Sequence, residues 1–73
     1  MTELDATGLK CPLPVLRARK ALKSVDPGAL LLVRATDPAS VKDFQVFCEE
    51  TAHEFVNWAE DDGVFRITLR KSA

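Results

Sequence analysis

A cysteine set just ahead of two prolines is the part of this sequence best suited to do chemistry. The segment is Lys10-Cys11-Pro12-Leu13-Pro14. A proline disfavours helical backbone in the residue before it, and prolines fit the first turn of a helix, where amide groups have no partner within the helix. Cys11 is therefore predicted to lie just outside a helix start, in a loop that Gly8 turns and the two prolines stiffen.

A thiol in that position is expected to be reactive, although a free cysteine can also be an ordinary small core residue. The positive end of the helix dipole, first-turn donors such as the Leu13 N–H, and the side chains of Lys10 and Arg17 all favour a thiolate. Desolvation by Leu9 and Leu13 opposes them, and we expect it to be the smaller effect at an exposed loop. We therefore predict that the pKa of Cys11 lies below its ordinary value of about 8.5. The same surroundings would stabilise a persulfide anion.

The elements that must position Cys11 are predicted from apolar spacing and turn residues. The expected order is strand Leu4–Ala6, helix Pro12–Ser24, strand Ala29–Ala35, a helix opened by Asp37-Pro38, strand Phe55–Glu60, a hairpin turn at 61–63 and strand Val64–Lys71. This order predicts one domain over residues 1–73, an α/β two-layer sandwich of β-α-β-α-β-β order. Two helices would cover one face of a four-stranded mixed sheet.

Apolar residues at helical and strand spacing predict the core. The strand 29–35 opens with an unbroken apolar run, 29–33, and this lack of alternation favours a central strand. The expected buried positions are Val15, Ala18, Leu22 and Val25 in the first helix, Val41, Phe44, Phe47, Cys48 and Ala52 in the second, and Phe65, Ile67 and Leu69 in the last strand.

Three other residues with chemical potential are better explained by structure. Cys48 falls on the apolar stripe of the second helix and is expected to be a buried thiol, with a resolving partner for Cys11 as the alternative. His53 is expected to have a helix-end or packing role rather than a catalytic one. Trp58 is expected in the core or on the sheet face. The spacing of Cys11, Cys48 and His53 is not that of a zinc site, so no metal and no cofactor are predicted.

Composition limits the class of protein. The chain has 73 residues, 47% of them hydrophobic, and only two cysteines. It shows no signal-peptide pattern, and its longest apolar run, 29–33, is too short to span a bilayer. A cytoplasmic protein with free thiols is expected, with no membrane association.

The charge is unevenly distributed, and the basic part surrounds Cys11. The overall charge is −1, but residues 1–36 hold six basic and three acidic side chains, whereas residues 37–62 hold one basic and eight acidic. Arg17 and Lys20 lie on the same side of the first helix as Leu13. Together with Lys10 they predict a partner-docking patch beside Cys11, and the alternative is a solvated helix face.

The pattern resembles the TusA-like, or SirA-like, family of sulfur carriers. The Cys-Pro-x-Pro element in this position is specific, and the resemblance covers nearly the whole chain. The matching residues are Leu4-Asp5, the segment 8–14, Arg17, Lys20, Gly28, Asp37-Pro38-Ala39, Asp43, Phe47-Cys48, His53-Glu54, Asp62-Gly63 and Leu69-Arg70-Lys71.

The resemblance implies a definite activity. Cys11 would accept sulfur as a persulfide, typically from a cysteine desulfurase, and relay it to a downstream acceptor protein. The chain would be a sulfurtransferase that works as a covalent carrier rather than as a free-standing multi-turnover enzyme. Family members serve tRNA 2-thiouridine formation, molybdenum-cofactor assembly, and sulfur or thiosulfate metabolism. The tRNA-pathway members carry an acidic residue where Leu13 stands here, so the pathway stays open.

Two other functions are compatible with the residues alone. One is a thiol-based redox sensor or regulatory module that uses Cys11. The other is an adaptor that binds through the basic first helix. Direct nucleic-acid binding is not expected, because Trp58 is the only tryptophan and the chain has no tyrosine to stack on bases. The size and mixed charge favour a monomer.

Overall fold

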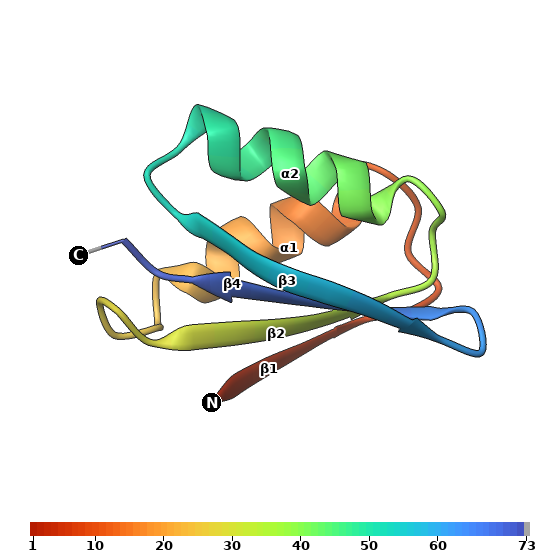
Figure 1. Cartoon of the computed structure of the whole chain (residues 1–73), viewed down its shortest axis with the longest axis horizontal. Helices are drawn as coiled ribbons and strands as arrows, with labels where there is room; N and C mark the ends of the chain where they lie inside the picture. The colour runs from red at the N-terminus through yellow and green to blue at the C-terminus, as the bar shows by residue number, and fades with distance from the viewer. Residues whose placement is uncertain (73) are drawn as a thin grey trace.

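A computed structural model describes residues 1–72 as a helical layer on a sheet (Figure 1). The elements, in chain order, are β1 (Thr2–Ala6), α1 (Leu13–Leu22), β2 (Leu30–Ala35), α2 (Ser40–Glu50), β3 (Glu54–Asp61) and β4 (Val64–Arg70). None of the helices in this part of the chain is long and apolar enough to cross a membrane.

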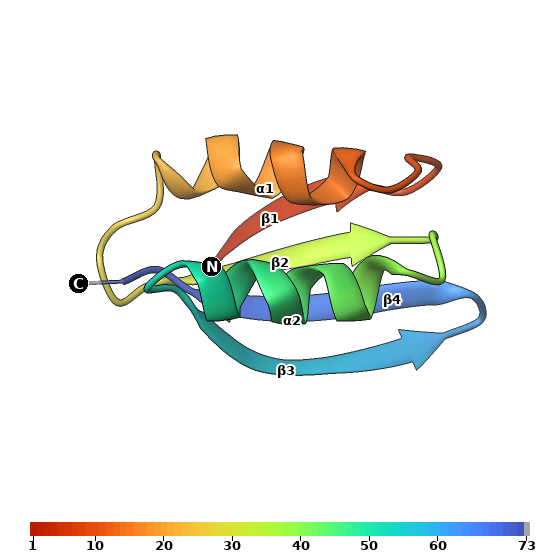
Figure 2. The same ribbon diagram turned by 90° about the horizontal axis from the view of Figure 1, so that it is seen from above.

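The sheet is mixed, with the strand order β1-β2-β4-β3. β1 and β2 are parallel, whereas β4 is antiparallel to both β2 and β3. Both helices lie on the same face of the sheet (Figures 1 and 2). The predicted two-layer fold is therefore confirmed. Because β1 and β2 run in the same direction, the loops that follow them leave the sheet at the same edge.

The core fills the space between this sheet face and the helices. Its fully buried side chains alternate along β2 and β4, and Leu31, Val33, Ile67 and Leu69 are all 0% exposed. α1 contributes Ala18 and Leu22, and α2 contributes Phe44 and Phe47, whose rings meet edge to face. The helical stripes were predicted correctly in outline. Val15, Val41 and Cys48 are only half-buried, and Ala52 is exposed beyond the end of α2.

The open face of the sheet explains why β2 looked continuous in sequence. β2 is central, as predicted, but its burial alternates, and Leu30 and Leu32 point to the face without helices. On that face, ion pairs join each central strand, β2 or β4, to the edge strand beside it, β1 or β3. The ion pairs are Arg34 with Glu3, Arg66 with Asp61, and Arg70 with Glu54.

Both helices begin later in the sequence than predicted. α1 begins at Leu13 and α2 at Ser40, so Asp37-Pro38 forms a turn ahead of the helix rather than its cap and first residue. The Asp37 side chain accepts the Ala39 N–H, and its carbonyl accepts the Ser40 N–H. Asp37 therefore organises the turn into α2 from outside the helix. The hairpin turn was predicted correctly, since Asp62 and Gly63 both have positive φ.

Candidate functional site

Cys11 lies in the loop between β1 and α1, at the edge of the sheet where β2 also ends. Gly8 adopts a φ of +80°, a conformation that favours glycine, and its N–H donates to the Thr36 hydroxyl at 2.9 Å. The Leu9 N–H donates back to the Ala6 carbonyl. The loop is thus tied both to its own strand and to the end of β2, and it carries an exposed cysteine. The Cys11–Pro12 peptide is cis.

One carboxylate joins this loop to the start of α2. An Asp37 side-chain oxygen accepts the Cys11 N–H at 2.8 Å, while the other accepts the Ala39 N–H at 2.8 Å. These hydrogen bonds lower the pKa of Asp37, because both stabilise the ionised form. Asp37 therefore stays charged and fixes the backbone of Cys11 relative to α2.

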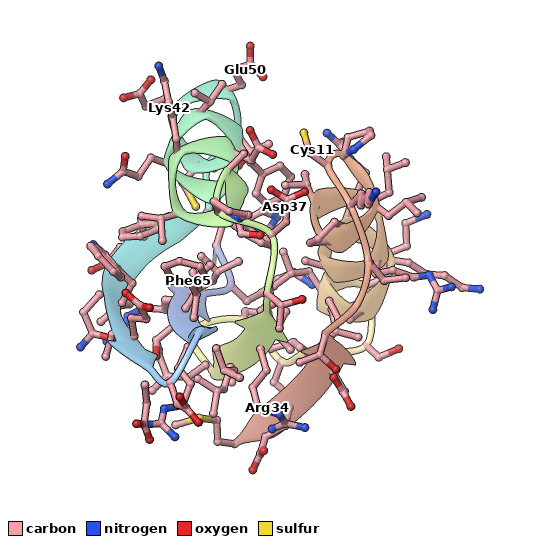
Figure 3. The ribbon with its side chains drawn as sticks, turned by 90° about the vertical axis from the view of Figure 1, so that its right-hand side faces the viewer. Cys11, Arg34, Asp37, Lys42, Glu50 and Phe65 are labelled. Carbon is pink, nitrogen blue, oxygen red and sulfur yellow. The ribbon has the colours of Figure 1, made fainter. Side chains whose placement is uncertain are left out.

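Cys11 opens onto a groove of about 270 Å³ between the two helices. In Figure 3, Cys11 lies at the start of α1 and beside α2, and Asp37 lies lower, between the two helices. The groove has an apolar floor with charged groups around it. Its lining residues are Cys11, Pro12, Val15, Arg19, Lys42, Asp43, Val46, Phe47 and Glu50.

An aromatic stack supports one wall of the groove. The Arg19 guanidinium carbon lies 5.2 Å from the centre of the Phe47 ring, a cation–π arrangement. Phe47 also stacks on the imidazole of His53, with ring centres 5.8 Å apart. The Nδ1 atom of His53 accepts the Ser72 N–H at 3.1 Å. His53 therefore has a packing role at the end of α2, as expected.

The prediction of an acidic Cys11 thiol is wrong. The pKa of Cys11 is raised above its ordinary value, chiefly by the nearby side chain of Asp43, which favours the protonated thiol. Desolvation and the negative charges of Asp43 and Asp37 act in the same direction. The first-turn donor expected to stabilise the thiolate is occupied, since the Leu13 N–H donates to the Lys10 carbonyl at 2.8 Å.

The predicted docking residues do not form one patch with Cys11 but lie on different sides of α1 and of the loop before it. Leu13 is 44% exposed on the outer surface of α1. Lys10 lines a separate hollow with Gly8, Thr36 and Asp37. Arg17 and Lys20 line another hollow, on the β1 side of α1. The structure thus places Cys11 and Arg19 on one side of α1 and the pair Arg17 and Lys20 on another.

The second thiol belongs to a different hollow. Cys48 is half-buried and lines this hollow together with His53 and Phe55. Burial raises the pKa of Cys48 to about 11. The two thiols line separate hollows on either side of α2, so the structure does not bring Cys48 to Cys11 as a resolving cysteine.

Sequence reasoning gave no role to several groove residues. Arg19 was not singled out, although Val15 and Arg19 are four residues apart and so share one side of α1. Asp43 was noted within the family pattern, but no local signal linked it to Cys11. Its partner lies across the helix–helix interface, and only the tertiary fold brings the two together.

Trp58 is on the sheet face, as expected, but 47% exposed. Trp58, in β3, aligns with Ile67 in β4. Its ring is tilted against the Phe65 ring, with ring centres 6.1 Å apart. It is not among the residues that line the groove at Cys11. Nothing in this placement gives Trp58 a part in the site.

Known proteins share both the sequence and the fold. The family model described as sulfurtransferase TusA matches residues 2–71. The sulfur carrier protein TusA of Allochromatium vinosum is 50% identical over 70 residues, covering 96% of this chain and 92% of that protein. The sulfur carrier protein TusA of Pseudomonas aeruginosa is 43% identical over 70 residues, covering 96% and 89%.

A solved structure extends this likeness to three dimensions. The crystal structure of a SirA-like protein from Desulfitobacterium hafniense superposes with a TM-score of 0.84, at 29% identity and with complete coverage of both chains. The family match spans almost the whole chain, including the Cys-Pro-x-Pro element at Cys11 and both helices of the groove. The chain therefore belongs to the TusA family of sulfur carriers.

Proposed function

We propose that Cys11 carries sulfur as a persulfide. The observation that carries the proposal is an exposed cysteine at the mouth of an open, partly apolar groove, in a chain of the sulfur-carrier family. Exposure and pKa support Cys11 over the second cysteine, because Cys48 is half-buried and its pKa is about 11. A covalent carrier needs a sulfur atom that a partner's active site can reach.

The proposed loading step conserves atoms and charge. The Cys11 sulfur attacks the terminal sulfur of a persulfide on the donor, so a new S–S bond forms on Cys11 while the S–S bond in the donor breaks. The donor cysteine leaves as a thiol, and no net proton or electron is consumed. Unloading repeats the exchange with an acceptor as nucleophile. The thiolate is the attacking form in both directions.

We propose a cysteine desulfurase as donor and a downstream sulfur-acceptor protein as recipient, in the cytoplasm. The acceptor would belong to tRNA thiolation, molybdenum-cofactor assembly, or sulfur and thiosulfate metabolism. Docking would use Leu13 as an apolar contact and Lys10, Arg17 and Lys20 as charged ones. All four side chains are exposed, which supports this, because rim charges steer association and apolar contacts prolong it.

The test is intact-mass analysis after incubation with a cysteine desulfurase and cysteine. Wild type and Cys48→Ala should each gain one sulfur that a reductant removes, whereas Cys11→Ser should gain none. Loading of Cys11→Ser at the wild-type level would overturn the assignment of the carrier residue.

The redox-sensor alternative is less well supported. Sensor cysteines are typically low-pKa thiols next to a resolving cysteine. Here the pKa of Cys11 is raised, and Cys48 lines a different hollow. Both observations favour a carrier that reacts only with a docked partner.

A further inference from the structure

The outer edge of β1 is the more regular of the two edges of the sheet. β1 and β3 are the outer strands, so each of them pairs with a neighbour on one side only. The pairing of β3 shifts register between Phe55 and Asn57, and such bulges commonly protect an edge strand from pairing with another chain. β1 pairs with β2 in unbroken register over Thr2–Ala6. Its outer edge therefore lacks the bulge that interrupts β3.

The charged side chains of β1 lie on the face of the sheet without helices. Glu3 pairs there with Arg34, and the Asp5 carboxylate accepts the N–H and the hydroxyl of Thr7. Leu4 lies between them in sequence and packs against the core, on the helical face. Both carboxylates are thus already engaged, and they point away from the space beside α1.

A hollow of about 560 Å³ lies between β1 and α1. In the view from above, α1 lies outside the first part of β1, so the helical layer reaches past the edge of the sheet (Figure 2). The lining residues are Leu4 from β1, Arg17, Lys20 and Ala21 from α1, and Ser24 just after it. A strand added to β1 would run beneath α1, with every second side chain facing this hollow.

The charge of the hollow indicates what such a strand must carry. Arg17 and Lys20 are both exposed, and the other lining residues that the structure describes are uncharged. Within residues 1–72, neither Arg17 nor Lys20 forms an ion pair. A segment with carboxylates at the positions that face the hollow would therefore complement it, whereas a basic segment would be repelled.

We propose that the β1 edge binds an extended, acidic segment of a partner protein by strand addition, with the carboxylates of the segment meeting Arg17 and Lys20 in the hollow. This inference rests on the proposed function only for the docking role of Arg17 and Lys20, and the binding itself needs no sulfur on Cys11. The groove at Cys11 lies on the other side of α1. A partner held at β1 therefore leaves the thiol open for loading and unloading.

The experiment titrates the labelled protein with a blocked peptide, Thr-Glu-Thr-Val-Thr-Glu-Thr, and follows backbone amides by NMR. In an extended peptide of this sequence, both glutamates and the valine share one face. Saturable shifts are expected over Thr2–Ala6, together with hydrogen exchange of β1 amides that is about tenfold slower in the complex. A matched peptide with glutamine in place of both glutamates should bind at least about fivefold more weakly, because it lacks the carboxylates.

Matched variants of the protein test the two cationic side chains. Lys20→Gln and Arg17→Gln should each weaken binding of the acidic peptide several-fold. Lys23→Gln is the control, since it removes the same charge from an exposed residue just after α1 that does not line the hollow. Its affinity for the peptide should stay near that of wild type. All three side chains are exposed, and circular dichroism checks that each variant folds.

Three outcomes would overturn the proposal. They are unchanged exchange of the β1 amides, equal affinity for the two peptides, and equal weakening by Lys20→Gln and Lys23→Gln. Shifts confined to the groove at Cys11 would also place the binding elsewhere. Cys11→Ser should bind the peptide as wild type does. A chain that binds the peptide but never loads sulfur would refute the proposed function alone, and one that loads sulfur without binding it would refute this inference alone.

Discussion

The two cysteines line hollows on either side of α2, and both have raised pKa values for different reasons. Around Cys11 the cause is a neighbouring carboxylate at an exposed loop, whereas around Cys48 it is burial against α2 and β3. A charge effect can be removed by one substitution or by an approaching cation. A burial effect persists until the structure opens. The comparison teaches that the same direction of pKa shift can come from a removable charge or from burial.

The largest expected effect separates the two thiols directly. With a pKa of about 11, roughly one Cys48 thiol in a thousand is ionised at pH 8. We therefore expect iodoacetamide to modify Cys48 in Cys11→Ser at least ~30-fold more slowly than Cys11 in Cys48→Ala at that pH. In concentrated urea the two rates should converge. A ratio near one under native conditions would show that burial does not protect Cys48.

A smaller effect tests whether the β1 side of α1 is the docking side. Arg17→Glu combined with Lys20→Glu should slow sulfur acceptance from the desulfurase by about tenfold at low salt, because complementary charges accelerate association. The difference should shrink at high salt. Loading with inorganic polysulfide requires no docking, so it provides the control and should remain at the wild-type rate. An unchanged desulfurase rate at low salt would mean that these two side chains are merely solvated.

Replacing the Asp37 carboxylate, which ties the Cys11 loop to α2, should have a smaller effect, and the effect is on stability. Asp37→Asn loses one acceptor oxygen for the Cys11 and Ala39 N–H groups, so the urea midpoint should fall. The pKa of Asp37 is lowered in the folded chain, so its contribution is present above the unfolded value near 3.8 and is lost as the pH falls further. Asp62→Asn is the matched control, since asparagine tolerates the positive φ at that turn. Equal midpoints for the two variants would contradict the role of Asp37.

The smallest expected effect concerns the hollow around Cys48. The pKa of His53 is lowered from 6.5, first by burial and then by the charges of Lys71 and Arg19. A lowered histidine pKa means that the unfolded chain binds the proton more readily, so its stabilising contribution is complete above pH 6.5 and declines as the pH drops below it. Urea titrations between pH 7.5 and 5 should show this decline in wild type. In His53→Gln the decline over the same range should be smaller, and an identical slope would remove His53 as its source.

The fold was predictable because its signals are local. The helical stripes, the alternation of Ile67 with its neighbours and the Asp-Gly hairpin each depend on residues close in sequence. The position of Cys11 before a helix was predicted from Pro12 for the same reason. Its electrostatics were not predictable, because Asp37 and Asp43 lie 26 and 32 residues away in sequence and reach the thiol only through the packing of α2.

The strand register has a further consequence, for how this chain can be joined to others. Thr2 aligns with Leu31, and Leu31 with Leu69, so β1 begins and β4 ends at the same end of the sheet. The Cys11 loop leaves from the opposite end, after Ala6 (Figure 1). An affinity tag or a second domain fused to either end of the chain would therefore extend away from the Cys11 loop. The domain is suited to modular fusion, with its reactive loop left open to solvent.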